Sequence, residues 1–170
     1  ARRSAILLLW RLDARLAELA RSGRETALRQ IRLRWWEDQL AGLSHGNPPP
    51  EPLLAELMQQ LAHLPAPEDM ARLAGGWGDT ATADGDGDGD GDGGGHGAIL
   101  YALTAQMLDS ASDDVMAAGR FFARVERAMA QGEGGANTWP PADDAIRLAD
   151  LPRALAALTA LAQAIARRSG

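Results

Sequence analysis

The twenty residues from Arg24 to Leu43, RETALRQIRLRWWEDQLAGL, constrain the fold of this chain more than any other stretch. On a helix, which turns by about 100° per residue, their large apolar side chains spread over an arc of about 200°. An arc that wide exceeds the stripe that a surface helix needs, so it predicts a central helix covered by neighbours on several sides. The apolar residues are Leu28, Ile31, Leu33, Trp35, Trp36, Leu40 and Leu43.

Arg32 falls inside this apolar arc, one turn before Trp35 and Trp36. We therefore expect its guanidinium to point into the interior, where a carboxylate or a bound anion must offset the cost of leaving water. A second inward charge is predicted on the preceding helix, residues 4–20, in which Asp13 projects among leucines. Because the link between the two helices is short, they should be antiparallel neighbours. Asp13 and Arg32 are then expected to meet, either as a buried salt bridge or as a ligand-binding pair.

Helical periodicity recurs along the rest of the chain, and no stretch shows the alternation of a strand. The sequence therefore predicts an all-α protein, a single-domain bundle of six or seven helices. Prolines, glycines and acidic residues mark the expected helix ends. The remaining helices are expected over residues 53–64, 68–77, 98–108, 115–130 and 152–167.

One low-complexity tract, residues 78–97, interrupts the helices with alternating Asp and Gly. It has no apolar side chain larger than alanine, so it is expected to be a disordered loop. A calcium loop starting at Asp84 would find acids at its first, third and fifth positions and Gly89 at its sixth. Its twelfth position is Gly95 instead of the bidentate glutamate, so the spacing favours a solvated loop over a specific calcium site.

Charge is divided unevenly along the chain, whose formal net charge is -6. Residues 1–43 hold nine arginines and five acids, whereas the remaining residues hold eight arginines and eighteen acids. The basic first third either steers an anionic ligand, such as a diphosphate or a lipid headgroup, or attracts the acidic remainder of the chain. An acidic chain without a basic-aromatic motif argues against nucleic acid as a partner. No stretch is long enough to span a bilayer, so we expect a cytoplasmic protein or one that contacts a membrane peripherally.

Carboxylates are the main candidates for catalytic groups. The chain lacks cysteine, which excludes thiolate catalysis and Cys-ligated zinc, and its three histidines share no ligand spacing. Asp109 and Asp113 are four residues apart, a spacing that on one helix face would hold Mg²⁺ against a diphosphate. The same acids also suit a connecting loop and the first turn of the next helix, where negative charge is favourable.

An apolar first helix followed by RETALRQIRLRWWEDQL resembles the N-terminal part of squalene/phytoene synthases, particularly the short bacterial members. The resemblance covers about residues 5–43. It implies the helical isoprenoid synthase fold in truncated form and a role in isoprenoid biosynthesis. The matching residues are Glu25, Arg32, Leu33, Trp35, Trp36 and Leu40.

Active members of that family are transferases that join two prenyl diphosphates head to head, with Mg²⁺ held by two aspartate-rich motifs. In this chain the first motif is reduced to Asp13, because Ala17 stands where its second acid belongs. The second motif, an acid cluster followed by Gly-Arg and an aromatic residue, is only partly matched, because the distance from the acids to the glycine is altered. Its residues are Asp109, Asp113, Asp114, Gly119 and Arg120.

The resemblance therefore implies a degenerate active site that would use Mg²⁺ if it were active. Its substrate-binding residues would hold a prenyl diphosphate or another isoprenoid lipid. The alternative is a non-catalytic helical scaffold or assembly module. That role has a precedent in the same superfamily, in a mitochondrial complex I assembly factor that also lacks the aspartate pairs. The implied substrate-binding residues are Arg32, Asp13, Trp35 and Trp36, and the implied metal ligands are Asp109 and Asp113.

Overall fold

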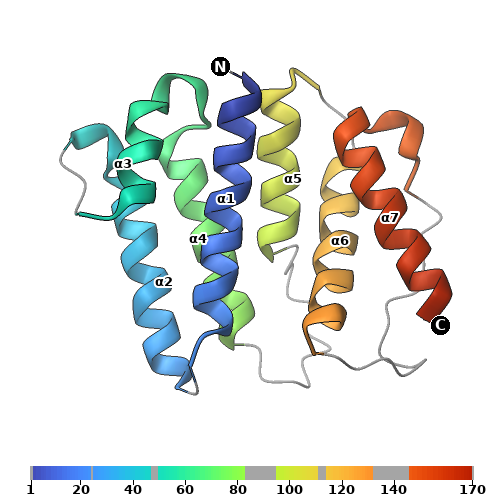
Figure 1. Cartoon of the computed structure of the whole chain (residues 1–170), viewed down its shortest axis with the longest axis horizontal. Helices are drawn as coiled ribbons and strands as arrows, with labels where there is room; N and C mark the ends of the chain where they lie inside the picture. Colours follow the sequence, from blue (N-terminus) through green and yellow to red (C-terminus); the bar gives the residue numbers. More distant parts are fainter. Residues whose placement is uncertain are drawn as a thin grey trace. The chain divides into compact units, whose positions relative to one another are not determined.

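A computed structural model of the 170-residue chain describes residues 2–23, 25–46, 50–82, 95–110, 114–131 and 146–169. The described residues form seven α-helices and three short 3-10 helices, and they contain no strand (Figure 1). The prediction of an all-α protein is confirmed. The α-helices are α1 (Arg2–Arg21), α2 (Thr26–Ala41), α3 (Pro52–Gln59), α4 (Pro67–Thr82), α5 (Gly95–Met107), α6 (Asp114–Gln131) and α7 (Arg153–Ser169). The 3-10 helices are η1 (Leu43–His45), η2 (Leu61–His63) and η3 (Leu148–Asp150).

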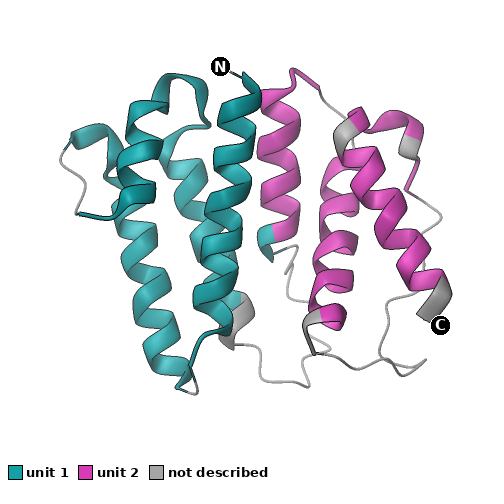
Figure 2. Cartoon of the chain, viewed as in Figure 1, with its two compact units in different colours: residues 1–96 teal, residues 97–170 magenta. Residues whose placement is uncertain are grey.

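The chain divides into two compact units, residues 1–96 and residues 97–170 (Figure 2). The first unit contains α1 to α4 and the beginning of α5, and the second contains the rest of α5 with α6 and α7. Each unit buries its own set of apolar side chains. The expectation of a single domain remains a prediction.

In the first unit, α4 is the helix on which α1 and α2 both pack. The amphipathic sequences of the three helices explain this arrangement, because each turns a row of large apolar side chains away from water. Burying such a side chain contributes about 1.5–3 kcal/mol to stability. The rows are Leu8, Leu9, Leu12 and Leu16 on α1, Leu33, Trp36 and Leu40 on α2, and Met70, Leu73 and Trp77 on α4.

The helices extend further into the Asp/Gly-rich tract than the composition predicts. Helix α4 continues to Thr82 and helix α5 begins at Gly95, so both ends of the expected loop are helical. The side chain of His96, expected in a solvated loop, is buried. Residues 83–94, which include the calcium-like spacing, lie outside the described residues.

In the second unit, α5 and α6 approach each other through two glycines. A Cβ atom added to Gly97 would overlap the carbonyl oxygen of Gly119, and one added to Gly119 would overlap the carbonyl of Gly97. Only residues without a side chain allow two helix backbones to lie this close. Helix α7 packs on α6 and completes the unit.

We predict that Gly119→Ala destabilises the protein by about 1–3 kcal/mol, because the added methyl group must push two backbones apart. The matched control is Gly78→Ala on α4, where a Cβ would meet nothing within 4 Å. That variant should be neutral or gain up to about 1 kcal/mol from helix propensity. Urea denaturation of both variants gives the comparison, and equal stabilities would contradict the close approach.

Tyr101, the only tyrosine in the chain, is fully buried in the second unit. Its ring lies 5.5 Å from that of Phe122, measured between ring centroids. Burial raises the pKa of Tyr101 to about 12, and the nearby Thr159 side chain acts in the opposite direction. The fold therefore favours the neutral phenol, because the charged form is poorly solvated there.

The pH dependence follows from the raised pKa of Tyr101. In the unfolded chain this phenol ionises near pH 10, so its contribution to stability is fully present below that pH. The contribution, on the order of 2–3 kcal/mol, is then lost as the pH rises towards about 12. Absorbance at 295 nm, recorded with and without urea, should show the shift directly because no other tyrosine contributes. Ionisation near pH 10 in the folded protein would show that the phenol is hydrated.

Candidate functional site

Asp13, predicted to point inward from the first helix, is buried with 6% of its surface exposed. Its carboxylate accepts a hydrogen bond of 2.8 Å from the indole Nε1–H of Trp77 on α4. A buried carboxylate is costly unless hydrogen bonds replace those it makes with water. The bond to Trp77 meets part of this need and links α1 to α4 through the core.

The indole of Trp77 also has an imidazole stacked on it. The His96 ring lies parallel to it, with ring centroids 3.5 Å apart and 15° between the planes. Gly76 makes this stacking possible, because a Cβ at that position would lie only 2.9 Å from the backbone nitrogen of His96. The guanidinium carbon of Arg21 lies 5.3 Å from the centroid of the indole ring. We call Asp13, Arg21, Trp77 and His96 the tryptophan cluster.

Sequence reasoning missed the partner of Asp13. The residues around Trp77 read as a helix end rich in glycine, and His96 follows a low-complexity tract, so neither carries a local signal of burial. A clue was available in the Gly-Gly pair before Trp77, since glycine inside a helix often marks a close approach of another backbone.

The predicted burial of Arg32 is wrong. Its side chain is exposed, and among the described residues no ion pair joins it to Asp13. Helix α2 is rotated so that Leu33 and Trp36 face the core, which leaves Arg32 on the side that faces water. This rotation avoids the cost of burying a guanidinium.

The prediction that α2 is covered on several sides is also wrong. Its main contacts within the first unit are with α4 and α1, and the side chains that it buries, Leu33, Trp36 and Leu40, lie on one side of the helix. Three large apolar side chains on the other side stay in contact with water: Leu28 is 46% exposed, Ile31 65% and Trp35 40%. The arc of about 200° therefore contains a core-facing row and a separate outward-facing row.

The outward-facing row is a compact feature. On a helix, Leu28, Ile31 and Trp35 fall within an arc of about 60°, and Arg32 lies about 40° beyond Leu28. The Trp35 ring is held edge-on against the buried Trp36, with 5.8 Å between centroids and 84° between planes. We call Leu28, Ile31, Arg32 and Trp35 the outer stripe. It contains two of the four predicted substrate-binding residues, whereas the other two, Asp13 and Trp36, belong to the core.

Asp109, one of the two predicted metal ligands, does not lie on a helix face. This residue lies in the turn after α5 with a φ of 52°, outside both neighbouring helices. Asp113 lies outside the described residues. The adjacent Asp114 accepts a hydrogen bond of 3.2 Å from the backbone N–H of Arg147. Within the described residues, no three His, Asp or Glu side chains are placed to hold a metal ion.

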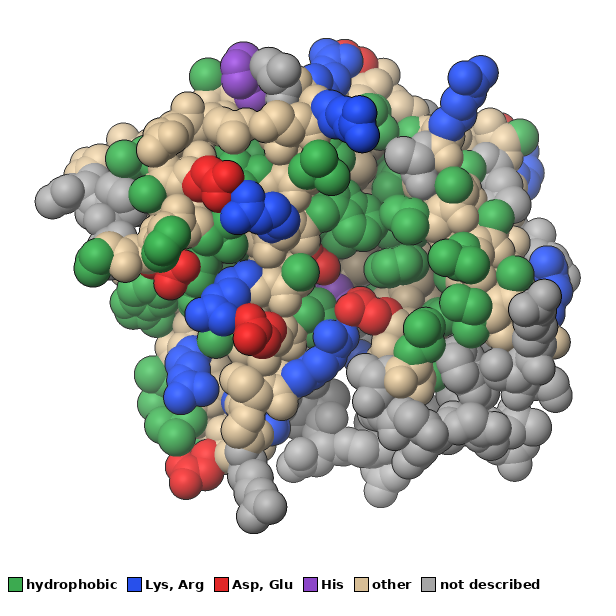
Figure 3. All heavy atoms as spheres, in the orientation of Figure 1, with side chains coloured by type: hydrophobic (Ala, Val, Ile, Leu, Met, Phe, Trp, Pro, Cys, Tyr) green, Lys and Arg blue, Asp and Glu red, His purple; other side chains and the backbone are tan. Residues whose placement is uncertain are grey.

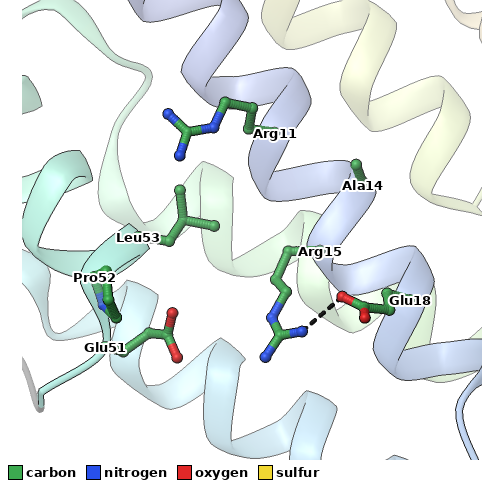
Figure 4. Close-up of a pocket in the computed structure, with 7 residues that line it drawn as sticks. All are labelled: Arg11, Ala14, Arg15, Glu18, Glu51, Pro52 and Leu53. Atoms are coloured by element: carbon green, nitrogen blue, oxygen red, sulfur yellow. Dashed lines mark hydrogen bonds and ion pairs between the residues drawn. The ribbon is translucent and has the colours of Figure 1, made fainter.

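An open cavity of about 400 Å³ lies between α1 and the start of α3 (Figure 4). Figure 4 shows the Arg15 guanidinium and the Glu51 carboxylate extending into the same space. Both arginines of this cavity already have acidic partners, because Arg11 pairs with Glu56 at 2.9 Å and Arg15 with Glu18 at 2.6 Å. These pairs lower the net charge that the cavity presents to an anion.

A second cavity, of about 370 Å³, lies between α2 and α4. It is lined by both charged and small side chains, and the Arg34 and Glu37 in its wall pair at 3.0 Å. Asp13, Arg32 and Trp35 line neither cavity. Figure 3 shows the same mixture of charges, with basic and acidic side chains interspersed over α1 to α3.

Comparisons with protein family models, with characterised proteins and with solved structures find no match to this chain. The resemblance to squalene/phytoene synthases therefore rests on the residues quoted above. Among the described residues, no helix has both the length and the apolar content needed to cross a bilayer.

We predict opposite outcomes for the two charges that the sequence paired. Asp13→Ala should destabilise the protein by about 1–3 kcal/mol, because it leaves the buried indole N–H of Trp77 without its acceptor. Trp77→Phe should be coupled to it, so that the double variant loses less than the sum of the single changes. Arg32→Ala, at an exposed position, should change stability by no more than about 0.5 kcal/mol.

Urea denaturation at neutral pH measures all four variants. Additive losses for Asp13 and Trp77 would show that their hydrogen bond contributes nothing. A loss of about 3–5 kcal/mol for Arg32→Ala would instead indicate a buried, paired guanidinium.

Proposed function

We propose that this chain is a squalene/phytoene synthase-like helical protein that acts by binding a partner instead of transferring prenyl groups. The binding surface is the outer stripe of α2. The observation that carries this proposal is the row of three large, exposed apolar side chains on a helix whose opposite side builds the core of the first unit.

Single exposed apolar residues are common on protein surfaces and need no explanation. The outer stripe differs because its members recur at the spacing of one helix face and include a tryptophan and an arginine. These two residue types are enriched among the side chains that dominate binding energy at protein interfaces. Trp35 also packs edge-on against the buried Trp36, a contact that reduces the side-chain freedom it loses when it binds.

The placement of the acids supports binding over catalysis. Ionising a prenyl diphosphate requires Mg²⁺ held between two carboxylate clusters that face the departing charge. Asp13 is buried and bonded to Trp77, and Asp109 lies in a turn with its side chain exposed. Neither carboxylate lines one of the two cavities. The alternative, Mg²⁺-dependent prenyl transfer, would require carboxylates other than Asp13 and Asp109 to hold the metal.

Site-specific cross-linking tests the proposal. A photo-reactive benzoylphenylalanine in place of Ile31 should form discrete covalent adducts in the host cell, because the outer stripe contacts a partner there. The matched control places the same group at Leu161 on α7, which is 59% exposed and belongs to the other unit. Position 161 should give no such adducts.

Equal labelling from positions 31 and 161 would contradict a binding role for the outer stripe. A catalytic role would show itself separately, as release of pyrophosphate from farnesyl or geranylgeranyl diphosphate with Mg²⁺. We expect no sustained release. Turnover that disappears in Asp109→Ala would overturn the proposal and support the transferase.

A further inference from the structure

The charge state of the outer stripe indicates what kind of partner it accepts. Arg34 of α2 pairs with Glu37 at 3.0 Å and with Asp38 at 3.5 Å. Arg29 donates to the Gly23 carbonyl at 3.0 Å and to the Thr26 hydroxyl at 2.9 Å. The arginines that flank the stripe on α2 are thus engaged within the helix and its N-terminal turn.

Arg32 differs from both, because among the described residues its guanidinium has no acidic or hydrogen-bonding partner. It stands on the stripe itself, beside Leu28 and Trp35, and is exposed. A guanidinium next to exposed apolar side chains suits a partner that places a carboxylate within its own apolar contact surface. The excess of arginine over acid in residues 1–43 favours the same sign of partner.

The shape of the stripe favours a helix as the contacting element. Its apolar side chains span about two helical turns, or roughly 10 Å, within an arc of about 60°. Such a narrow ridge fits the groove between side-chain rows of a second helix. A bilayer surface is flat and would contact a much wider arc, which includes the exposed ion pairs of Arg34 with Glu37 and Asp38. Because Arg34 and Arg29 are already engaged within the helix and its N-terminal turn, this arc offers little positive charge to anionic headgroups.

A second copy of this chain fits less well. If two stripes packed antiparallel with their apolar residues overlapping, the two-fold axis would bring one Arg32 next to the other. Like charges at that position oppose pairing. The complementary surface is instead one with an acid opposite Arg32.

We propose that the outer stripe binds an amphipathic helix of another protein, with apolar residues at i, i+3 or i+4, and i+7 and with an Asp or Glu facing Arg32. This inference rests on the proposed function and names the chemistry of its partner. The apolar ridge contributes most of the contact, and Arg32 selects a partner that places an acidic side chain opposite it. Because one helix stripe is smaller than the roughly 800 Å² per partner of a standard interface, we expect micromolar binding.

Two synthetic peptides test the inference. They share one helical leucine pattern, and they differ only in the residues that flank it, which are glutamate in one peptide and lysine in the other. Fluorescence anisotropy with the full chain should give a Kd at least tenfold lower for the glutamate peptide. Arg32→Glu should reverse this order, and Ile31→Asp should weaken binding of both peptides at least tenfold. Leu161→Asp, on the other unit, should leave both affinities unchanged.

The other outcomes overturn the inference in distinct ways. Equal binding of the two peptides, still lost in Ile31→Asp, would mean that the stripe is the site but does not select an acidic partner. Binding to anionic vesicles, or self-association, that depends on Ile31 while neither peptide binds would assign the stripe to a membrane or to a second copy. If one of these results is obtained but cross-linked adducts still form from position 31, the proposed binding role of the outer stripe stands and only the helix inference fails. If no adducts form from position 31, the proposed function fails as well. Circular dichroism confirms that each variant is folded.

Discussion

The hydrogen bond between Trp77 and Asp13 is the interaction on which the first unit depends. It places a carboxylate in the core, where an unsatisfied charge would be costly, and gives it a donor from a different helix. The same indole stacks on His96, so one side chain contacts residues from the first helix and from the start of the fifth. Gly76 allows this contact because the absence of a Cβ lets the chain at residues 95–96 approach α4.

The apolar packing on α4 sets the orientation of α2. Helix α4 offers its apolar side to α1 and α2 together, and α2 meets it with Leu33, Trp36 and Leu40. Once these three side chains face α4, the periodicity of the helix turns Leu28, Ile31 and Trp35 away from it. The exposed row is therefore a geometric consequence of core packing, and its apolar character is the property that calls for a functional explanation.

The carboxylates that resemble a prenyltransferase motif lie in different surroundings in the described part of the chain. Asp13 accepts the indole hydrogen bond, Asp114 binds the backbone of Arg147, and Asp109 occupies a turn with a positive φ. The indole hydrogen bond occupies one oxygen of Asp13 and fixes the orientation of this carboxylate in the core. The contacts of Asp13 and Asp114 stabilise the fold, whereas the outer stripe on α2 is the surface that we propose binds a partner.

The sequence by itself determined the class of fold, the positions of the seven helical segments with ends up to five residues away, and the burial of Asp13, because helical periodicity and helix-end residues are local properties. It also predicted inward burial for Arg32 and coverage of α2 on several sides, and both were wrong. Periodicity shows which residues share a face of a helix, but not how many faces have neighbours. Only the packing of α2 on α4 and α1 decided that Leu28, Ile31 and Trp35 remain exposed. In the same way, only the packing of α1 on α4 decided that Asp13 bonds to Trp77, sixty-four residues away, since local sequence does not specify which distant side chain a residue meets.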